Sequence, residues 1–189
     1  MNKMKALISF VLLNLVVSSP AIIFAQETFG TLNPTAPEET AQFQFLVGRW
    51  HAEYSGISSD GTVTKGTADW RIKYILNGFA LQDEWSYSLP DGTIAGYGTM
   101  FRTFDAKKKE WTIVEQTTGN LEFNHMTAQK VGDTMVMYEE GETPDGKIHM
   151  RRVFYNITKD SFDWRYDISR DGGKTWQENV ARMKCTRVK

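Results

Sequence analysis

The chain of 189 residues contains a single cysteine, and this shortage excludes several kinds of site. With only Cys185, no intramolecular disulfide can form, and a metal site of the Cys-x-x-Cys type is ruled out. No histidine neighbours Cys185 in the sequence, so we expect a half-buried residue near the end of the last strand. The three histidines, His51, His125 and His149, are too scattered to specify a metal, and no metal site is predicted.

The chain also has little net charge, since 22 lysine and arginine residues stand against 23 acidic ones. Residues 1–25 contain two lysines and no acid, so the remainder has 20 basic against 23 acidic residues, a formal charge of −3. The lysines at 107–109 are the densest basic run and fall in a predicted turn. Because such a chain offers no basic surface, we predict no nucleic-acid partner.

The first 25 residues have the organisation of a secretory signal peptide. A short basic region precedes an apolar run over 6–17, and small residues follow up to Ala25, after which we place the cleavage. The run is shorter than the ~20 residues of a membrane-spanning helix, so we expect no stable membrane insertion after cleavage and a periplasmic or secreted location. The expected organisation is a signal peptide over 1–25, a linker over 26–40 and a barrel domain over 41–189.

No segment within 48–188 has the apolar period of a helix; the segments alternate between apolar and polar residues instead. Nine turn sequences at even spacing, among them "SSDG" at 58–61, "PDG" at 90–92 and "RDGG" at 170–173, separate ten such segments. Asn-Gly and Asp-Gly favour tight hairpins, because these residues tolerate positive φ. Closure would remove the two free edges of so long a meander. We predict an all-β fold, a ten-stranded antiparallel up-and-down β-barrel with tight turns at one end.

The stretch "PEETAQFQFLVG" before the first strand predicts one or two helical turns. Thr35 or Thr40 would cap this element, and Phe43, Leu46 and Val47 would face inward. We expect the short helical segment to cap one mouth of the barrel.

The stretch "FQFLVGRWHAEYSG" contains a Gly-x-Trp motif, Gly48 and Trp50, and is followed by "GFALQDEW", "GYGTMFRTFDAKKKEW" and "DGGKTW". This ordered series resembles a family of secreted bacterial lipocalin-like proteins of the calycin type whose function is unknown, over about residues 41–188. The resemblance implies a calycin-like barrel, a fold whose members mostly bind apolar or amphipathic small molecules. It also implies that a late-strand arginine, Arg182 or Arg187, packs on Trp50 in a structural role.

Haem-binding relatives of the nitrobindin type also begin with a Gly-x-Trp strand. Their opening usually continues with further glycines, where this chain has "HAEYSG". The departure disfavours haem, and no cofactor is assigned.

The stretch "ISRDGGKTW" at 168–176 resembles the Asp-box of sialidases. An Asp-box is a hairpin in which Asp171 accepts hydrogen bonds from turn amides and Gly172 and Gly173 allow positive φ. Sialidases combine several such hairpins with an arginine cluster, and this chain has one box and about half the necessary length. We interpret the motif as a structural turn.

Aromatic side chains on the predicted inner faces form the candidate wall of a ligand site. Period-two alternation places them on the same faces as other apolar residues, which a barrel turns inward. They are Trp70, Tyr74, Trp85, Trp164 and Tyr166.

Four polar residues are also predicted to point inward, namely Asp83, Glu115, His125 and Arg152. Asp83 alternates with Leu81 and Trp85, and His125 alternates with Phe123. An unpaired charge in such a place would cost several kcal/mol. The four residues therefore pair in an internal network that closes the barrel bottom, orient a polar ligand, or act in general acid–base catalysis.

The leading functional hypothesis is non-covalent binding of a small apolar or amphipathic molecule inside the barrel, with no catalytic residue assigned. One alternative is a haem-binding protein or an isomerase or cyclase that uses the cavity, with His125 or an acid of raised pKa. Another is a cavity-free module that binds an envelope protein through its outer surface.

Overall fold

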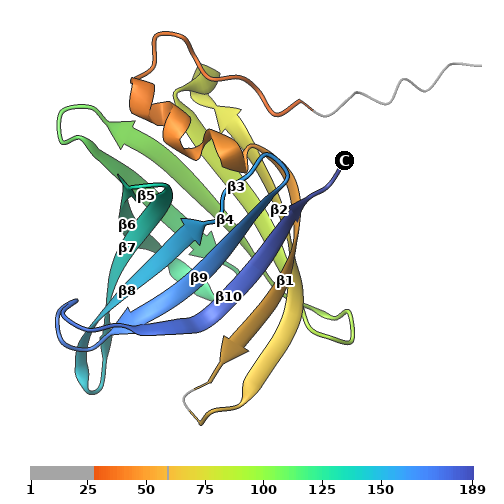
Figure 1. Cartoon of the computed structure of the whole chain (residues 1–189), viewed down its shortest axis with the longest axis vertical. Helices are drawn as coiled ribbons and strands as arrows, with labels where there is room; N and C mark the ends of the chain where they lie inside the picture. The colour runs from red at the N-terminus through yellow and green to blue at the C-terminus, as the bar shows by residue number, and fades with distance from the viewer. Residues whose placement is uncertain (1–27, 59) are drawn as a thin grey trace, which may run out of the picture.

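Ten β-strands follow one another along the chain, each antiparallel to the next, and the last pairs with the first to close a barrel (Figure 1). The computed structural model describes residues 28–58 and 60–189. The strands are β1 (Gly48–Ile57), β2 (Val63–Ile75), β3 (Ala80–Ser88), β4 (Ile94–Asp105), β5 (Glu110–Thr117), β6 (Asn120–Val131), β7 (Thr134–Thr143), β8 (Gly146–Tyr155), β9 (Ser161–Ser169) and β10 (Gln177–Arg187). Two short 3₁₀ helices, η1 (Glu38–Leu46) and η2 (Leu76–Gly78), complete the described chain. The predicted up-and-down barrel is confirmed.

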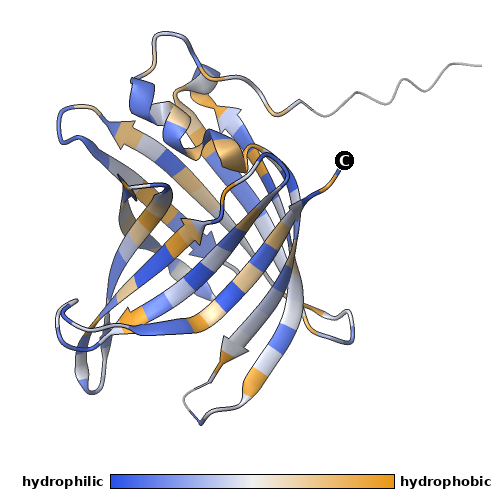
Figure 2. Cartoon of the chain, in the orientation of Figure 1, coloured by the Kyte–Doolittle hydropathy of each residue, from blue (hydrophilic) through white to orange (hydrophobic). Residues whose placement is uncertain are grey.

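Alternating burial along the strands explains the closure. On β2, Ala68 and Ile72 are buried, and on β9 Phe162 and Trp164 are buried, each separated by more exposed residues. The hydropathy bands in Figure 2 follow this alternation along the strands. Leu76 is an exception at 68% exposed, because it lies in the β2–β3 turn rather than on a strand. The inner faces together form one core.

The segment η1 covers one end of the barrel (Figure 1). Phe43 and Leu46 are fully buried, and the ring of Phe43 lies 4.9 Å from that of Trp111 in an edge-to-face contact. The Trp111 indole N–H also donates to the Gln42 side chain at 3.0 Å. A short helical segment that caps one mouth is therefore confirmed.

The helix cap differs from the expectation. The residue before η1 is Pro37, and no side chain caps the helix, so the prediction that Thr35 or Thr40 does so is wrong. Thr35 instead donates to the Asn33 side chain at 2.7 Å in the preceding turn. Proline fixes φ in a range compatible with the start of a helical turn, and the Pro37 carbonyl accepts a hydrogen bond from the Thr40 N–H at 2.9 Å.

Residues 29–33, within the predicted linker, contact the same end of the barrel. The Tyr74 N–H donates to the Phe29 carbonyl at 2.8 Å, and the Asn33 N–H donates to the Gly78 carbonyl at 3.2 Å. The predicted signal peptide over 1–25 lies outside the described residues. Within the described part of the chain, no helix is long and apolar enough to cross a membrane.

Both residues of the Gly-x-Trp motif lie against Arg187, at the end of the last strand, β10. The Arg187 guanidinium lies 4.1 Å from the centre of the Trp50 ring and donates to the Val47 and Phe45 carbonyls at 2.8 and 3.2 Å. Gly48 has φ of 134°, and a side chain there would collide with Arg187. The arginine that packs on Trp50 is thus Arg187, one of the two candidates, and the contact joins η1 to β1 and β10.

Replacing Arg187 by alanine is expected to lower the free energy of unfolding by about 2 kcal/mol, since it leaves carbonyls without donors and removes the contact with Trp50. Urea unfolding followed by tryptophan fluorescence measures the change. The control is Arg182→Ala, an exposed arginine on the same strand, which should change stability by less than about 0.5 kcal/mol. Equal losses of stability in the two variants would contradict the conclusion that the contacts of Arg187 with η1 and Trp50 stabilise the fold.

The Asp-box stretch forms a hydrogen-bonded turn between β9 and β10. The Thr175 amide and hydroxyl donate to the Asp171 carboxylate at 2.9 and 2.6 Å, and the Gly173 N–H donates to the Ser169 hydroxyl at 2.9 Å. The Thr175 hydrogen bonds hold the pKa of Asp171 well below its usual range. The Trp176 indole donates to the Gly173 carbonyl at 3.1 Å. The interpretation of the stretch as a turn is confirmed.

Cys185 lies on the inner side of β10 and is 2% exposed, so it is fully rather than half buried. Burial raises the pKa of the Cys185 thiol well above its usual range. A thiol held protonated in this way is a poor nucleophile.

Candidate functional site

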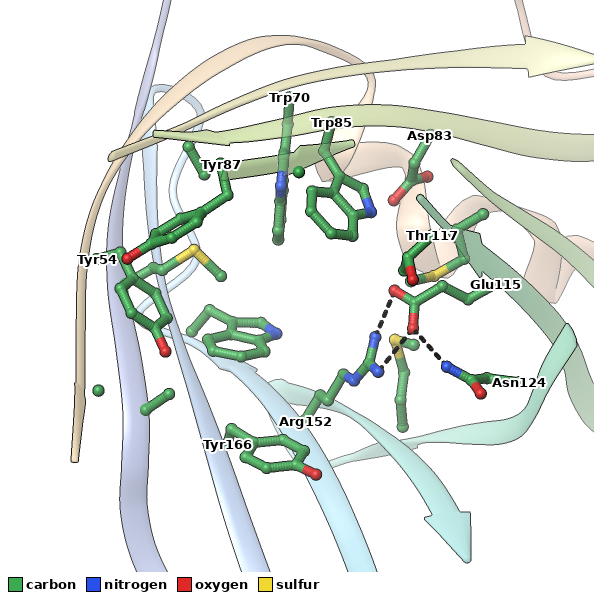
Figure 3. A pocket seen from close by; sticks show the side chains of 18 of the residues that line it. Tyr54, Trp70, Asp83, Trp85, Tyr87, Glu115, Thr117, Asn124, Arg152 and Tyr166 are labelled. Carbon is green, nitrogen blue, oxygen red and sulfur yellow. Dashed lines mark hydrogen bonds and ion pairs between the residues drawn. The ribbon is translucent and has the colours of Figure 1, made fainter. Parts of the chain in front are cut away.

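The barrel contains a cavity of about 810 Å³. Figure 3 shows side chains that line it. Its lining reaches the strand ends beside three turns, at residues 56–58, 95–97 and 117–119. These turns join β1 to β2, β3 to β4 and β5 to β6, so the cavity opens at the end that carries the tight Asp-Gly turns. An interior of this volume contradicts the alternative of a cavity-free module.

Four of the five predicted aromatic wall residues line this cavity, namely Trp70, Trp85, Trp164 and Tyr166. The rings of Trp164 and Tyr166 lie 6.3 Å apart and nearly parallel, at 9°. Tyr74 does not line the cavity, so its predicted place in the wall is wrong. It shares the inner face of β2, but lies nearer the end closed by η1, where it packs into the core.

Two further tyrosines, which sequence reasoning did not assign to the site, lie nearer the mouth. The rings of Tyr54 and Tyr87 meet edge to face, 5.0 Å apart (Figure 3). Tyr54 continues the inward series of Trp50 and Ala52 on β1, and Tyr87 continues that of Trp85 on β3. The period-two pattern therefore carried the signal for both residues.

Glycines on neighbouring strands allow the rings to lie against the wall. Gly98 is paired with Trp85 across β3 and β4, and a Cβ at Gly98 would overlap three atoms of the indole ring. A Cβ at Gly66 would likewise contact the ring of Tyr87. The Trp85 ring therefore packs directly against the Gly98 backbone, and it lines the cavity.

The floor of the cavity contains a buried ion pair between Asp83 and Arg102, which are 2% and 1% exposed. The Arg102 guanidinium also lies over the Phe43 ring of η1, 5.1 Å from its centre. Burial raises the pKa of the Asp83 carboxyl, and the neighbouring Arg102 offsets this only in part. Sequence reasoning placed Asp83 correctly on an inner face but missed Arg102, which alternates with Met100 and Phe104 on β4.

A second network lies beside the first and includes two other residues predicted to face inward, Glu115 and Arg152. The Arg152 guanidinium donates two hydrogen bonds to the Glu115 carboxylate, both at 2.8 Å, and a third to Glu139 at 3.1 Å. The Asn124 amide donates to Glu115 at 3.4 Å (Figure 3). Glu139 and Asn124 were not predicted. Arg152 thus joins carboxylates from β5 and β7 across the interior.

The two carboxylates of this network have opposite pKa shifts. Burial alone would raise the pKa of Glu115, but the hydrogen bonds and charge of Arg152 outweigh it and lower that pKa below the ordinary 4.5. Burial raises the pKa of Glu139, which receives only one hydrogen bond from Arg152. Burial and the adjacent Glu139 also raise the pKa of the Tyr166 hydroxyl to about 12.

The structure corrects the placement of His125. Its side chain is exposed on the outer face of β6, whereas Asn124 and Met126 point inward. His125 was predicted to point inward because it alternates with the apolar residue Phe123. Phe123 is 55% exposed, however, so both residues lie on the outer face in this half of the strand. A register shift between Glu115 and Thr117 on the paired strand accompanies this change.

No histidine of the described residues lines the cavity, since His51 and His149 also lie outside its lining. The His51 imidazole is 2.8 Å from Asp69 on the outer surface. His125 therefore cannot act inside the barrel as a haem ligand or a base, and that assignment is wrong. Over residues 28–58 and 60–189, no group of three or more His, Cys, Asp or Glu side chains is arranged to hold a metal ion.

Solved structures of other proteins share this barrel, including the following two. The crystal structure of Rv2717c from M. tuberculosis matches with a TM-score of 0.58 and 15% identity, over 84% of this chain and 99% of that one. The S-type phycobiliprotein lyase CPES from Guillardia theta matches with a TM-score of 0.54 and 13% identity, over 78% and 91% of the two chains. No protein-family model and no curated protein sequence matches the chain. At these identities the comparison shows a calycin-like fold alone.

Proposed function

We propose that this protein binds a small amphipathic molecule inside the barrel, non-covalently. The observation that carries the proposal is the cavity of about 810 Å³, walled by aromatic rings near its mouth and by paired charges at its floor. Ligand sites in proteins are typically concave and apolar, with a few polar groups that fix orientation. Trp70, Trp85 and Trp164 would contact the apolar part of the ligand, and the network around Arg152 would face its polar end.

A cavity-filling substitution tests this function. Ala181 lines the cavity from β10. In Ala181→Trp the new ring would occupy part of the cavity, and fitting a ligand beside it would cost about 1–3 kcal/mol. Binding of the neutral fluorescent probe N-phenyl-1-naphthylamine should therefore weaken at least about tenfold. Ala106→Trp is the matched control, since Ala106 is exposed in the β4–β5 turn. Titration of probe fluorescence measures both variants. If the wild type gives no saturable binding, or both variants bind as it does, the cavity is not a ligand site.

We also propose that the protein is exported and acts outside the cytoplasm. The support is the order of basic, apolar and small residues over 1–25, which is typical of a signal peptide cleaved after Ala25. The N-terminal sequence of the protein recovered from the periplasm or medium tests this proposal. An uncleaved Met1 in the cytoplasmic fraction would contradict it.

A further inference from the structure

The charges that line the cavity are unequal in number. Three carboxylates, Asp83, Glu115 and Glu139, face two guanidinium groups, Arg102 and Arg152, and the lining contains no lysine and no histidine. Both arginines keep their charge at neutral pH, so the carboxylates beside them serve as counter-ions. The difference, 2 − 3, gives the described lining a formal charge of −1.

Neither arginine is available for an anionic ligand. Arg152 already binds Glu115 twice and Glu139 once, and Arg102 is paired with Asp83. The Nε atom of Arg102 has no hydrogen-bond partner among the described residues, but it is buried and therefore out of reach of the cavity. A carboxylate or phosphate in the cavity would have to break an existing ion pair and would meet an excess of negative charge.

Glu139 can still accept a hydrogen bond from a ligand. Its Oε2 atom accepts from Arg152 at 3.1 Å, whereas Oε1 has no hydrogen-bond partner within residues 28–58 and 60–189. Its side chain is 14% exposed and lines the cavity beside Tyr166. One oxygen of the floor is thus open toward the interior, and it carries the surplus charge.

The aromatic wall favours the same kind of ligand. Trp85 packs against Gly98 and lines the cavity, and Trp164 and Tyr166, which also line it, stack nearly parallel. The face of an aromatic ring carries negative potential and attracts cations, most strongly for tryptophan. Aromatic rings and a surplus carboxylate line the same cavity, and these are the two elements of ammonium recognition.

We infer that the polar end of the ligand is a cation, an ammonium group on an apolar or aromatic body, held by Glu139 and the tryptophan faces. The inference rests on the proposed function and specifies its ligand class. A cation would bring the cavity to neutrality without breaking either ion pair. An anionic amphiphile of similar size would not.

Three probes that share one ring system and differ mainly in their polar end test the inference. They are 2-(2-naphthyl)ethylamine, which is cationic at neutral pH, the neutral 2-(2-naphthyl)ethanol, and the anionic 3-(2-naphthyl)propionate. Isothermal titration calorimetry should show the amine binding about tenfold tighter than the alcohol, and the propionate weaker than both. Glu139→Gln should reduce amine affinity about tenfold while alcohol affinity changes less than about twofold. Glu140→Gln, on the next residue with its side chain 66% exposed, is the matched control and should leave both unchanged.

The outcomes separate this inference from the proposed function. If the alcohol or the propionate binds as tightly as the amine, or if Glu139→Gln weakens all three probes equally, the cation inference fails while binding in the barrel stands. If none of the probes binds and N-phenyl-1-naphthylamine also fails to bind, the proposed function fails with it. Amine selectivity that Glu139→Gln removes and Glu140→Gln retains supports the inference.

Discussion

Arg102→Met is expected to lower the free energy of unfolding by about 3–5 kcal/mol, the loss typical of removing one partner from a buried ion pair. Asp83 is 2% exposed and would keep its carboxylate in the floor of the cavity without a counter-ion. Arg102 also joins β4 to η1 through the Phe43 ring, so its removal loosens the cap. Urea unfolding followed by tryptophan fluorescence and circular dichroism measures the loss.

The double variant Asp83→Leu, Arg102→Met separates the ion pair from the space it fills. Replacing both partners by apolar side chains should recover most of the stability, because no buried charge then remains. The matched control is Glu84→Gln, whose carboxylate pairs with Arg71 at 3.0 Å on the outer face and should contribute less than about 1 kcal/mol. If the double variant is no more stable than Arg102→Met, packing rather than charge compensation explains the loss.

The sequence alone leaves open whether Asp83 belongs to an internal network, orients a ligand or acts in acid–base catalysis. Its pairing with a nearly fully buried arginine makes stability the first property to change. The internal network of acids and arginine, one of the interpretations open at the sequence level, accounts for Asp83 and Arg102.

The fold was predictable because a barrel requires little more than regular alternation and tight turns. Trp70 and Ile72 on β2, and Phe162 and Trp164 on β9, have the expected phase, and the Asp-Gly turns all lie at one end. Period two fixes which side of a strand a residue occupies, and closure then fixes that side as inside or outside. The family resemblance added an arginine packed on Trp50, with Arg182 and Arg187 as candidates, and the structure identifies Arg187.

The site was less predictable, because alternation gives the side of a strand but not the depth along the barrel. Tyr74 and Trp70 share a face, yet only Trp70 reaches the cavity. The cavity also inverts the usual rule that apolar residues lie inside. Asn124 points inward while Phe123 is exposed, and Arg102 points inward while Phe101 is 37% exposed. A polar cavity floor therefore misleads any assignment that uses hydrophobicity alone.

The sequence also could not predict which side chains inside the barrel form ion pairs with one another. Arg152 was predicted to face inward, but Glu115 lies 37 positions away along the chain, and only the closed barrel brings the two side chains together. Glu139 is on β7, whose sequence places a second glutamate, Glu140, directly beside it on the opposite face. The strand's own pattern does not state which of the two points inward.

Arg152→Met should reverse the pH dependence that Glu115 contributes to stability. In the wild type the pKa of Glu115 is lowered, so its contribution is present above the ordinary pKa of 4.5 and is lost as the pH falls through the folded-state value. Without Arg152, burial is opposed only by the Asn124 hydrogen bond and the charge of Arg102, which are smaller, and we expect the pKa of Glu115 to rise. A raised pKa reverses the sign, so the contribution is then present at low pH and lost as the pH rises. Glu139, whose pKa is already raised, changes in the same direction.

The stability deficit of Arg152→Met relative to the wild type should thus be about 3–5 kcal/mol near neutral pH and should narrow toward about pH 5. Denaturant unfolding of both proteins at the two pH values gives this difference, in which groups common to both proteins cancel. In the double variant Glu115→Gln, Arg152→Met, the narrowing should shrink, because one of the two unpaired carboxyls no longer titrates. If the difference in free energy of unfolding stays constant or widens on acidification, Arg152 stabilises the barrel by packing. Protonation of the carboxyls can recover stability only if the variant lost a counter-ion to them.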